Sequence, residues 1–190
     1  DHSRFLTRTN GQVGRIQNKG TEAAEEGINE AVMREAVIMQ MTWPGAPTVY
    51  YGDEAGVCGF TDPDNRRTYP WGHEDKQMLL FHKEAIRIHR NSTALCTGSY
   101  KMLYTAWGIL AYGRFDEKER YTVIVNNTQD TVNVAIPVWQ IGVTDGSRME
   151  QQLMSSSASF TKVPNIYVVT DGYLMIAMPK TSAVILKDIG

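Results

Sequence analysis

Cysteine is scarce in this sequence, which has two cysteines among 190 residues. Cys58 and Cys96 do not match the paired spacings of a zinc site, and they cannot build a disulfide framework. We therefore expect each of them to be a buried free thiol. We also expect no metal ion or other cofactor in this segment.

The sequence also lacks an excess of either charge and any long apolar run. Its 19 Lys and Arg nearly balance 21 Asp and Glu, so that no nucleic-acid or membrane-surface partner is expected. No apolar run reaches transmembrane length, and residues 1–20 are too polar for a signal peptide. The chain opens on DHSRFLTRTNG without a methionine, and we expect it to be the tail of a longer protein, either cytoplasmic or secreted.

The first half of the sequence has the order of a parallel α/β unit: loop, helix, strand, loop, helix. Residues 1–27 are polar and predict a loop. Apolar side chains at helical spacing predict two helices, at about 25–41 and 75–89. The expected apolar stripes are Ile28, Val32, Ala36 and Met39 in the first helix, and Met78, Phe81, Ala85 and Ile88 in the second. Residues 47–51 between them are β-branched or aromatic in the main and predict a short buried strand.

The pattern changes near residue 93. The remaining chain consists of short alternating or apolar runs, separated by turn signals such as Asp145-Gly146 and Asp171-Gly172. Such spacing is typical of an antiparallel sandwich or barrel. We therefore divide the chain into an α/β part, residues 1–92, and an all-β part, residues 93–190.

A glycine and two carboxylates directly follow the predicted strand, in the stretch APTVYYGDEAG. Taken alone, this stretch is typical of a surface turn. However, a long polar loop at the carboxyl end of a parallel strand is where such folds place their ligands. The loop continues as AGVCGFTDPDNRRTYPWGHED and contains Asp62 and Arg66.

The stretches PGAPTVYYGDEAG and DPDNRRTYPW closely resemble the last barrel strand and following loop of the α-amylase family, glycoside hydrolase family 13. The opening DHSRFLTR is similar to the segment after the seventh strand of that barrel. The resemblance implies that residues 1–92 are the last part of a (β/α)8 TIM barrel, with its eighth strand at 49–51. It implies that residues 93–190 are the antiparallel β-sandwich usually called domain C.

The resemblance also implies roles for three residues. Retaining glycosidases use a carboxylate nucleophile and a carboxylic acid, which in this family come from the fourth and fifth strands, outside this sequence. Asp1 would be the third carboxylate, which stabilises the transition state; the alternative is a charged chain terminus. Asp62 and Arg66 would bind sugar on the non-reducing side of the cleaved bond; the alternative is a salt bridge within the loop.

We interpret Asp53 and Glu54 as supports of the loop rather than the catalytic pair, because consecutive side chains diverge at such a turn. They would accept hydrogen bonds from backbone amides or from an arginine. Tyr69 and Trp71 allow two interpretations: they close the loop against the barrel, or they stack on a sugar face.

The implied function is retaining hydrolysis or transfer at α-glucosidic bonds of an α-glucan or maltooligosaccharide, by an α-amylase- or neopullulanase-like parent protein. The 190 residues alone would be inactive. The missing N-terminal barrel portion, or another chain, would cover the open edge of the eighth strand. Calcium binding by the parent stays open. The alternatives are a non-catalytic relative and a carbohydrate- or partner-binding module, although Trp107 and Trp139 form no paired platform in the sequence.

Overall fold

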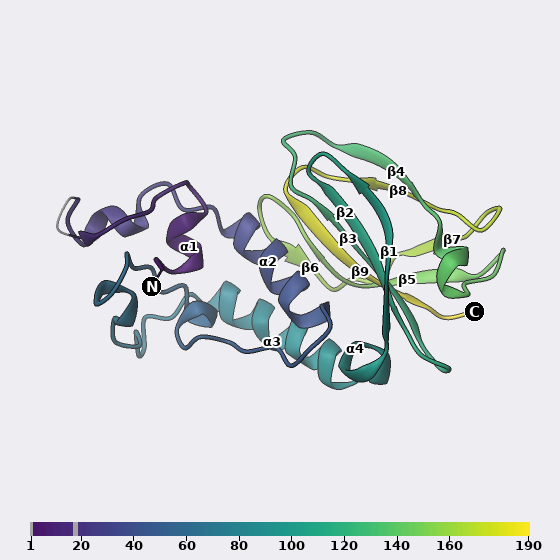
Figure 1. The fold of residues 1–190 in the computed structure, drawn as a ribbon, viewed down its shortest axis with the longest axis horizontal. Helices are drawn as coiled ribbons and strands as arrows, with labels where there is room; N and C mark the ends of the chain where they lie inside the picture. The colour runs from purple at the N-terminus through teal and green to yellow at the C-terminus, as the bar shows by residue number, and fades with distance from the viewer. Residues whose placement is uncertain (1, 17–18) are drawn as a thin grey trace.

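The computed structural model describes residues 2–16 and 19–190 (Figure 1). Helices occupy the first half of the chain: α1 (Phe5–Arg8), α2 (Glu30–Thr42), α3 (Lys76–Arg90) and α4 (Thr93–Thr97), with 3-10 turns η2 (Glu22–Glu25), η3 (Asp53–Ala55) and η4 (Asp64–Arg66). None of the helices in the described ranges is long and apolar enough to span a membrane.

Both long helices begin at a side-chain cap. The Asn29 side chain accepts hydrogen bonds from the backbone amides of Ala31 and Val32, at the start of α2. Asp75 accepts bonds from the amides of Gln77 and Met78, at the start of α3. Such caps satisfy amides that have no partner within the helix. The two predicted helices are therefore confirmed, with bounds shifted by a few residues.

The strands all lie after residue 98 in the described chain and pair antiparallel. They are β1 (Ser99–Ala106), β2 (Ile109–Phe115), β3 (Arg120–Asn126), β4 (Val132–Ile136), β5 (Arg148–Ser155), β6 (Phe160–Thr161), β7 (Ile166–Val168), β8 (Leu174–Met178) and β9 (Ser182–Asp188), with the 3-10 turn η5 (Val138–Ile141) between β4 and β5. The larger sheet has the order β1-β2-β3-β9-β5-β6, with β7 also paired to β5, and the smaller sheet is β4-β8. This mostly antiparallel arrangement is that of a β-sandwich, as predicted.

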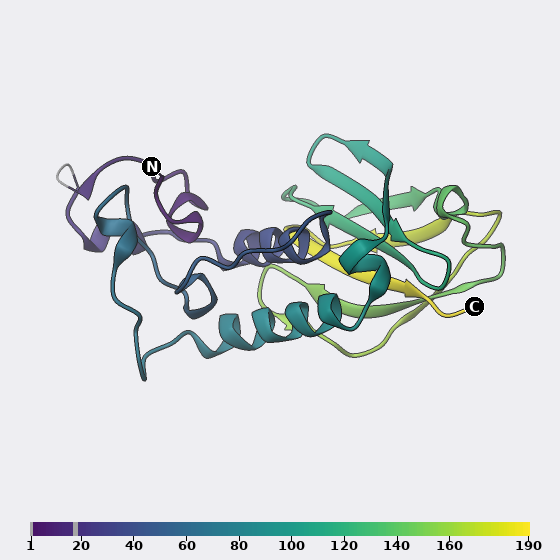
Figure 2. The same ribbon diagram turned by 60° about the horizontal axis from the view of Figure 1, so that its bottom comes forward.

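The larger sheet is covered on both faces. Side chains of one face, such as Tyr112, Val123 and Ile185, form a single core with α2 and α3. Those of the other face, such as Ile124 and Val184, form a second core with β4 and β8. Figure 2 shows α2 and α3 side by side against the sheet. The two parts of the chain on either side of residue 92 therefore share one apolar core. The division into two domains at that residue stays a prediction.

The face of α2 that packs against the sheet differs from the predicted one. The predicted stripe of α2 is only partly buried, whereas Met33, Val37, Ile38 and Met41 are buried in the core. By contrast, all four stripe residues predicted for α3 are buried. The physical reason is that α2 is apolar on more than one side, so that periodicity alone does not select the packed face.

The predicted strand at 47–51 is not formed: residues 46–50 carry no regular secondary structure, and residues 51–52 form a turn. A strand requires a neighbour to complete its ladder of hydrogen bonds, and no strand lies beside this segment in the described residues. The barrel part of the fold class is therefore not established by this structure. The sandwich part is.

Candidate functional site

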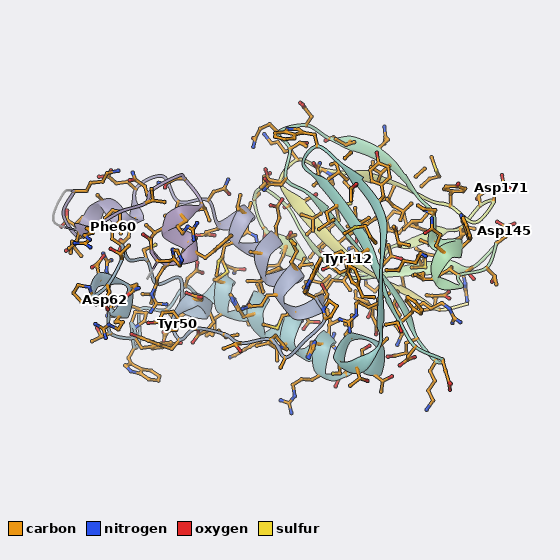
Figure 3. The ribbon with its side chains drawn as sticks, in the orientation of Figure 1. Tyr50, Phe60, Asp62, Tyr112, Asp145 and Asp171 are labelled. Atoms are coloured by element: carbon orange, nitrogen blue, oxygen red, sulfur yellow. The ribbon has the colours of Figure 1, made fainter. Side chains whose placement is uncertain are left out.

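The segment after residue 2 and the loop at 50–72 lie together at one end of the molecule. Figure 3 labels Tyr50, Phe60 and Asp62 there, opposite the sandwich end, which carries Asp145 and Asp171. Backbone bonds join the two segments: the Arg4 amide donates to the Gly59 carbonyl at 2.9 Å. The Gly59 amide donates to Thr7 Oγ1 at 2.9 Å.

Arg4 is the centre of this junction, and its side chain is fully buried. Its guanidinium donates to the carbonyl of Tyr51 at 2.7 Å, to the carbonyl of Asn65 at 2.8 Å and to Asp53 Oδ1 at 2.9 Å. It also lies 4.4 Å from the ring centroid of Tyr50, within the range of a cation–π interaction. Arg4 thus connects the N-terminal segment to the turn at 51–53 and to the loop at residue 65.

The interpretation of the two consecutive acids as loop supports is confirmed. Asp53 accepts from Arg4, and Glu54 Oε2 accepts from the Gly52 amide at 2.9 Å. Burial raises the pKa of the Asp53 carboxyl, and the Arg4 guanidinium opposes that rise. Gly52 has a φ of 88°, and a Cβ there would lie 2.8 Å from Val57 Cγ2. The turn therefore requires glycine.

A second ion pair fixes the loop and was not predicted. Arg67 donates to both carboxylate oxygens of Asp64, at 3.0 and 2.9 Å, and to Glu25 Oε1 at 3.1 Å. Burial pushes the pKa of Asp64 upward, but bonds from Arg67 and the Phe60 amide bring it below its ordinary value. Asp64 and Arg67 are three residues apart, a spacing that is compatible with an ion pair. The sequence did not show whether Arg66 or Arg67 binds this acid, because the two arginines are adjacent.

The predicted sugar-binding residues Asp62 and Arg66 lie next to this clamp and form an ion pair with 2.5 Å between Arg66 Nη2 and Asp62 Oδ1. Their side chains are 41% and 61% exposed. Both groups are therefore accessible to a ligand, and the pair is compatible with both interpretations. The third predicted residue, Asp1, lies outside the described residues.

The two aromatic side chains of the loop lie against each other, with ring centroids of Tyr69 and Trp71 4.5 Å apart. Trp71 is 80% exposed and is not part of either core. Within the described chain, it does not close the loop against other elements.

An apolar groove of about 580 Å³ runs beside α2 and the segment that was predicted as a strand. Its lining residues include Phe5, Ala36, Met39, Trp43 and Pro47. Ala36 and Met39 belong to the stripe predicted to be the packed face of α2. This stripe therefore borders an open groove rather than the centre of the core.

The thiols and potential metal ligands form no site in the described chain. Cys58 is buried, as expected, but Cys96 is exposed, since it lies on the short helix α4 at the surface. Among residues 2–16 and 19–190, no group of three or more His, Cys, Asp or Glu could hold a metal ion.

Several curated proteins are similar to this chain. It is 31% identical over 185 residues to an amylopullulanase of Thermoanaerobacter thermohydrosulfuricus. This match covers 92% of this chain and 12% of the relative. It is 35% identical over 130 residues to a cyclomaltodextrinase of Thermoanaerobacter pseudethanolicus. This second match covers 67% of this chain and 20% of the relative. No protein-family model matches the chain.

Solved structures share the fold. An Anoxybacillus α-amylase superimposes with a TM-score of 0.74 at 23% identity, covering 87% of this chain and 34% of that one. The α-amylase of Geobacillus thermoleovorans, solved with acarbose, gives a TM-score of 0.75 at 20% identity, covering 90% and 36%. The sandwich with its attached helices is thus an α-amylase type of fold.

Together, these similarities show that the chain belongs to the α-amylase family, glycoside hydrolase family 13. It spans only about a tenth of the length of the amylopullulanases that it matches. The chain therefore corresponds to a part of these relatives and not to their whole length.

Proposed function

We propose that this chain is part of a retaining glycoside hydrolase that cleaves or transfers α-glucosidic bonds in α-glucans or maltooligosaccharides. The observation that carries the proposal is the similarity to amylopullulanases along nearly the whole chain, at 31–32% identity. The relatives that match at this level are named for action on glucans.

In this proposal, residues 1–92 complete a (β/α)8 barrel and 49–51 become its eighth strand once the preceding strands are present. The apolar groove supports this assignment, because α2 presents apolar side chains both to the sandwich core and to the groove. A helix that is apolar on opposite sides is usually buried on both. The preceding barrel portion, or another chain, would cover the groove.

The loop at 61–72 would then contribute Asp62 and Arg66 to the sugar-binding site. Their ion pair leaves acceptor and donor atoms exposed, and a planar guanidinium beside a carboxylate suits a ring with several hydroxyl groups. The Arg4–Asp53 and Arg67–Asp64 pairs would keep the loop in place. Asp1 would stabilise the transition state, while the nucleophile and the acid would come from the preceding barrel strands.

Kinetics of Arg66→Ala in the full-length parent protein test this assignment. We expect kcat/KM to fall about tenfold or more for long maltooligosaccharides and to change little for the shortest cleaved substrate. The matched control is Arg90→Ala, which removes an exposed arginine at the end of α3. An equal effect of Arg66→Ala on all chain lengths would rule out the proposed subsite.

A further inference from the structure

The indole of Trp139 is held in place although most of it is exposed. Trp139 lies in η5 and is 55% exposed. Its amide donates to the Gly172 carbonyl at 3.1 Å. A Cβ placed on Gly172 would lie 3.1 Å from Cβ and Cδ1 of Trp139, so that the ring sits directly against the glycine backbone. A side chain at position 172 would require the indole to shift by a few tenths of an ångström, and the φ of 79° also favours glycine there.

Hydrogen bonds join three turns at the sandwich end: η5, which carries Trp139, and the turns at 170–173 and 144–147. The turn at 170–173 is closed by two backbone bonds between Thr170 and Tyr173, at 3.0 and 2.9 Å. The neighbouring turn at 144–147 is attached to it, because the Gly146 amide donates to the Val169 carbonyl at 2.9 Å. The two acids labelled at this end in Figure 3, Asp145 and Asp171, occupy these turns.

These turns combine the groups that a carbohydrate site needs. Tyr173, which follows Gly172, is 41% exposed and supplies a second aromatic side chain. An aromatic ring offers a rigid apolar surface at a small cost in conformational entropy, and the C–H face of a glucose ring can stack on it. Asp145 and Asp171 are exposed carboxylates that can accept hydrogen bonds from sugar hydroxyl groups.

Trp139 differs in burial from its neighbours in η5. Val138 and Ile141 are buried in the core between the sheets, whereas Trp139 is not part of that core. Trp and Tyr are enriched among the residues that contribute most of the binding energy at protein surfaces.

We propose that Trp139, Tyr173, Asp145 and Asp171 form an accessory α-glucan-binding site at the sandwich end of the molecule, remote from the loop at 61–72. The inference rests on the proposed function for the identity of its ligand. Figure 3 places Asp62 and Asp171 at opposite ends of the molecule, so that binding at this site does not involve the loop at 61–72.

Adsorption of the 190-residue chain to insoluble starch, together with titration with maltoheptaose, tests the proposal. We expect the unaltered chain to bind and Trp139→Ala to weaken binding about tenfold. Trp107→Ala is the matched control, because Trp107 is 97% exposed at the tip of the β1–β2 hairpin. Arg90→Ala in the same chain should leave binding unchanged, because Arg90 is exposed at the end of α3 and belongs to neither proposed site. Absence of binding by the unaltered chain, or equal binding by Trp139→Ala, overturns the proposal.

Activity of the full-length parent protein separates this proposal from the proposed function. Trp139→Ala should hydrolyse maltotriose at the same rate as the unaltered protein but should degrade starch granules more slowly. If the parent cleaves no glucan at all, the proposed function fails, whereas the accessory site is still decided by the adsorption assay.

Discussion

Asn127, in the turn after β3, donates a hydrogen bond of 2.6 Å from Nδ2 to Oε2 of Glu35 on α2. This bond joins the helical part of the chain to the sandwich. Glu35 is only 3% exposed, and its second oxygen, Oε1, has no hydrogen-bond partner in the described chain. Burial raises the pKa of Glu35 to about 7, against a smaller opposing effect of Asn127.

Glu35 should make the folded chain less stable as the pH rises. Between the ordinary glutamate pKa of 4.5 and about 7, the folded state keeps a proton that the unfolded state has lost. Unfolding therefore releases this proton, and the free energy of unfolding decreases with pH across that window. A shift of this size corresponds to about 3 kcal/mol, at about 1.4 kcal/mol for each pKa unit.

The replacement Glu35→Gln tests this dependence, because glutamine stays neutral and keeps an oxygen that can accept from Asn127. We expect the variant to be about as stable as the unaltered chain at pH 4.5 and more stable by a few kcal/mol at pH 8. Urea unfolding at both pH values measures the difference. Parallel stability curves for the two proteins would show that Glu35 does not titrate as described.

The buried Arg4 pair should contribute far more to stability than the exposed pair in the same region. Arg4→Ala leaves the buried side of Asp53 without its cation and removes the donor of the Tyr51 and Asn65 carbonyls. We expect a loss of about 3 kcal/mol, since breaking a buried pair leaves a charge and polar groups unsatisfied.

Arg66→Ala is the matched control for Arg4, because the Asp62–Arg66 pair is exposed. Its removal should cost less than about 1 kcal/mol. Urea unfolding of both variants, followed by circular dichroism, gives the two values. A similar cost for both would mean that Arg4 does not organise the loop.

The sequence predicts the packed face of a helix only where its apolar side chains lie on one side. The stripe of α3 was predicted correctly, because that helix has a polar face opposite an apolar one. In α2, apolar residues lie on several sides, and Arg34 and Glu35 are buried at the junction with the sandwich. Their partners, the Ser156 carbonyl and Asn127, are more than 90 residues away in sequence, so that no local pattern indicates them.

The candidate site was predicted only in part, because some of its contacts also join residues that are distant in sequence. Gly52, Asp53 and Glu54 are neighbours in sequence, and their position after a β-branched and aromatic stretch indicates a supported turn, which the structure contains. The arginine that binds Asp53 lies 49 residues earlier and could not be assigned from spacing. Trp139 appeared isolated in the sequence, because its contact with Gly172 depends on how two distant turns meet.

The last prediction is that the 190-residue chain hydrolyses no glucan by itself. A retaining mechanism needs a nucleophile that forms the covalent intermediate and an acid that protonates the leaving group, about 5 Å apart. The four acids between residues 53 and 64 all have partners. Asp53 is bound by Arg4 and Asp64 by Arg67 on both oxygens, while Glu54 accepts from the Gly52 amide and Asp62 pairs with Arg66.

Incubation of the pure chain with maltooligosaccharides, followed by analysis of the released sugars, measures this activity directly. We expect no release above the background of a mock purification. Release that copurifies with the chain and is lost in Asp1→Asn would contradict the prediction, because a single stabilising carboxylate lowers the barrier only where a nucleophile is present. Such a result would require another carboxylate of this chain, such as Asp53 or Glu54, to act as nucleophile, and Asp53→Asn and Glu54→Gln would then identify which of the two reacts.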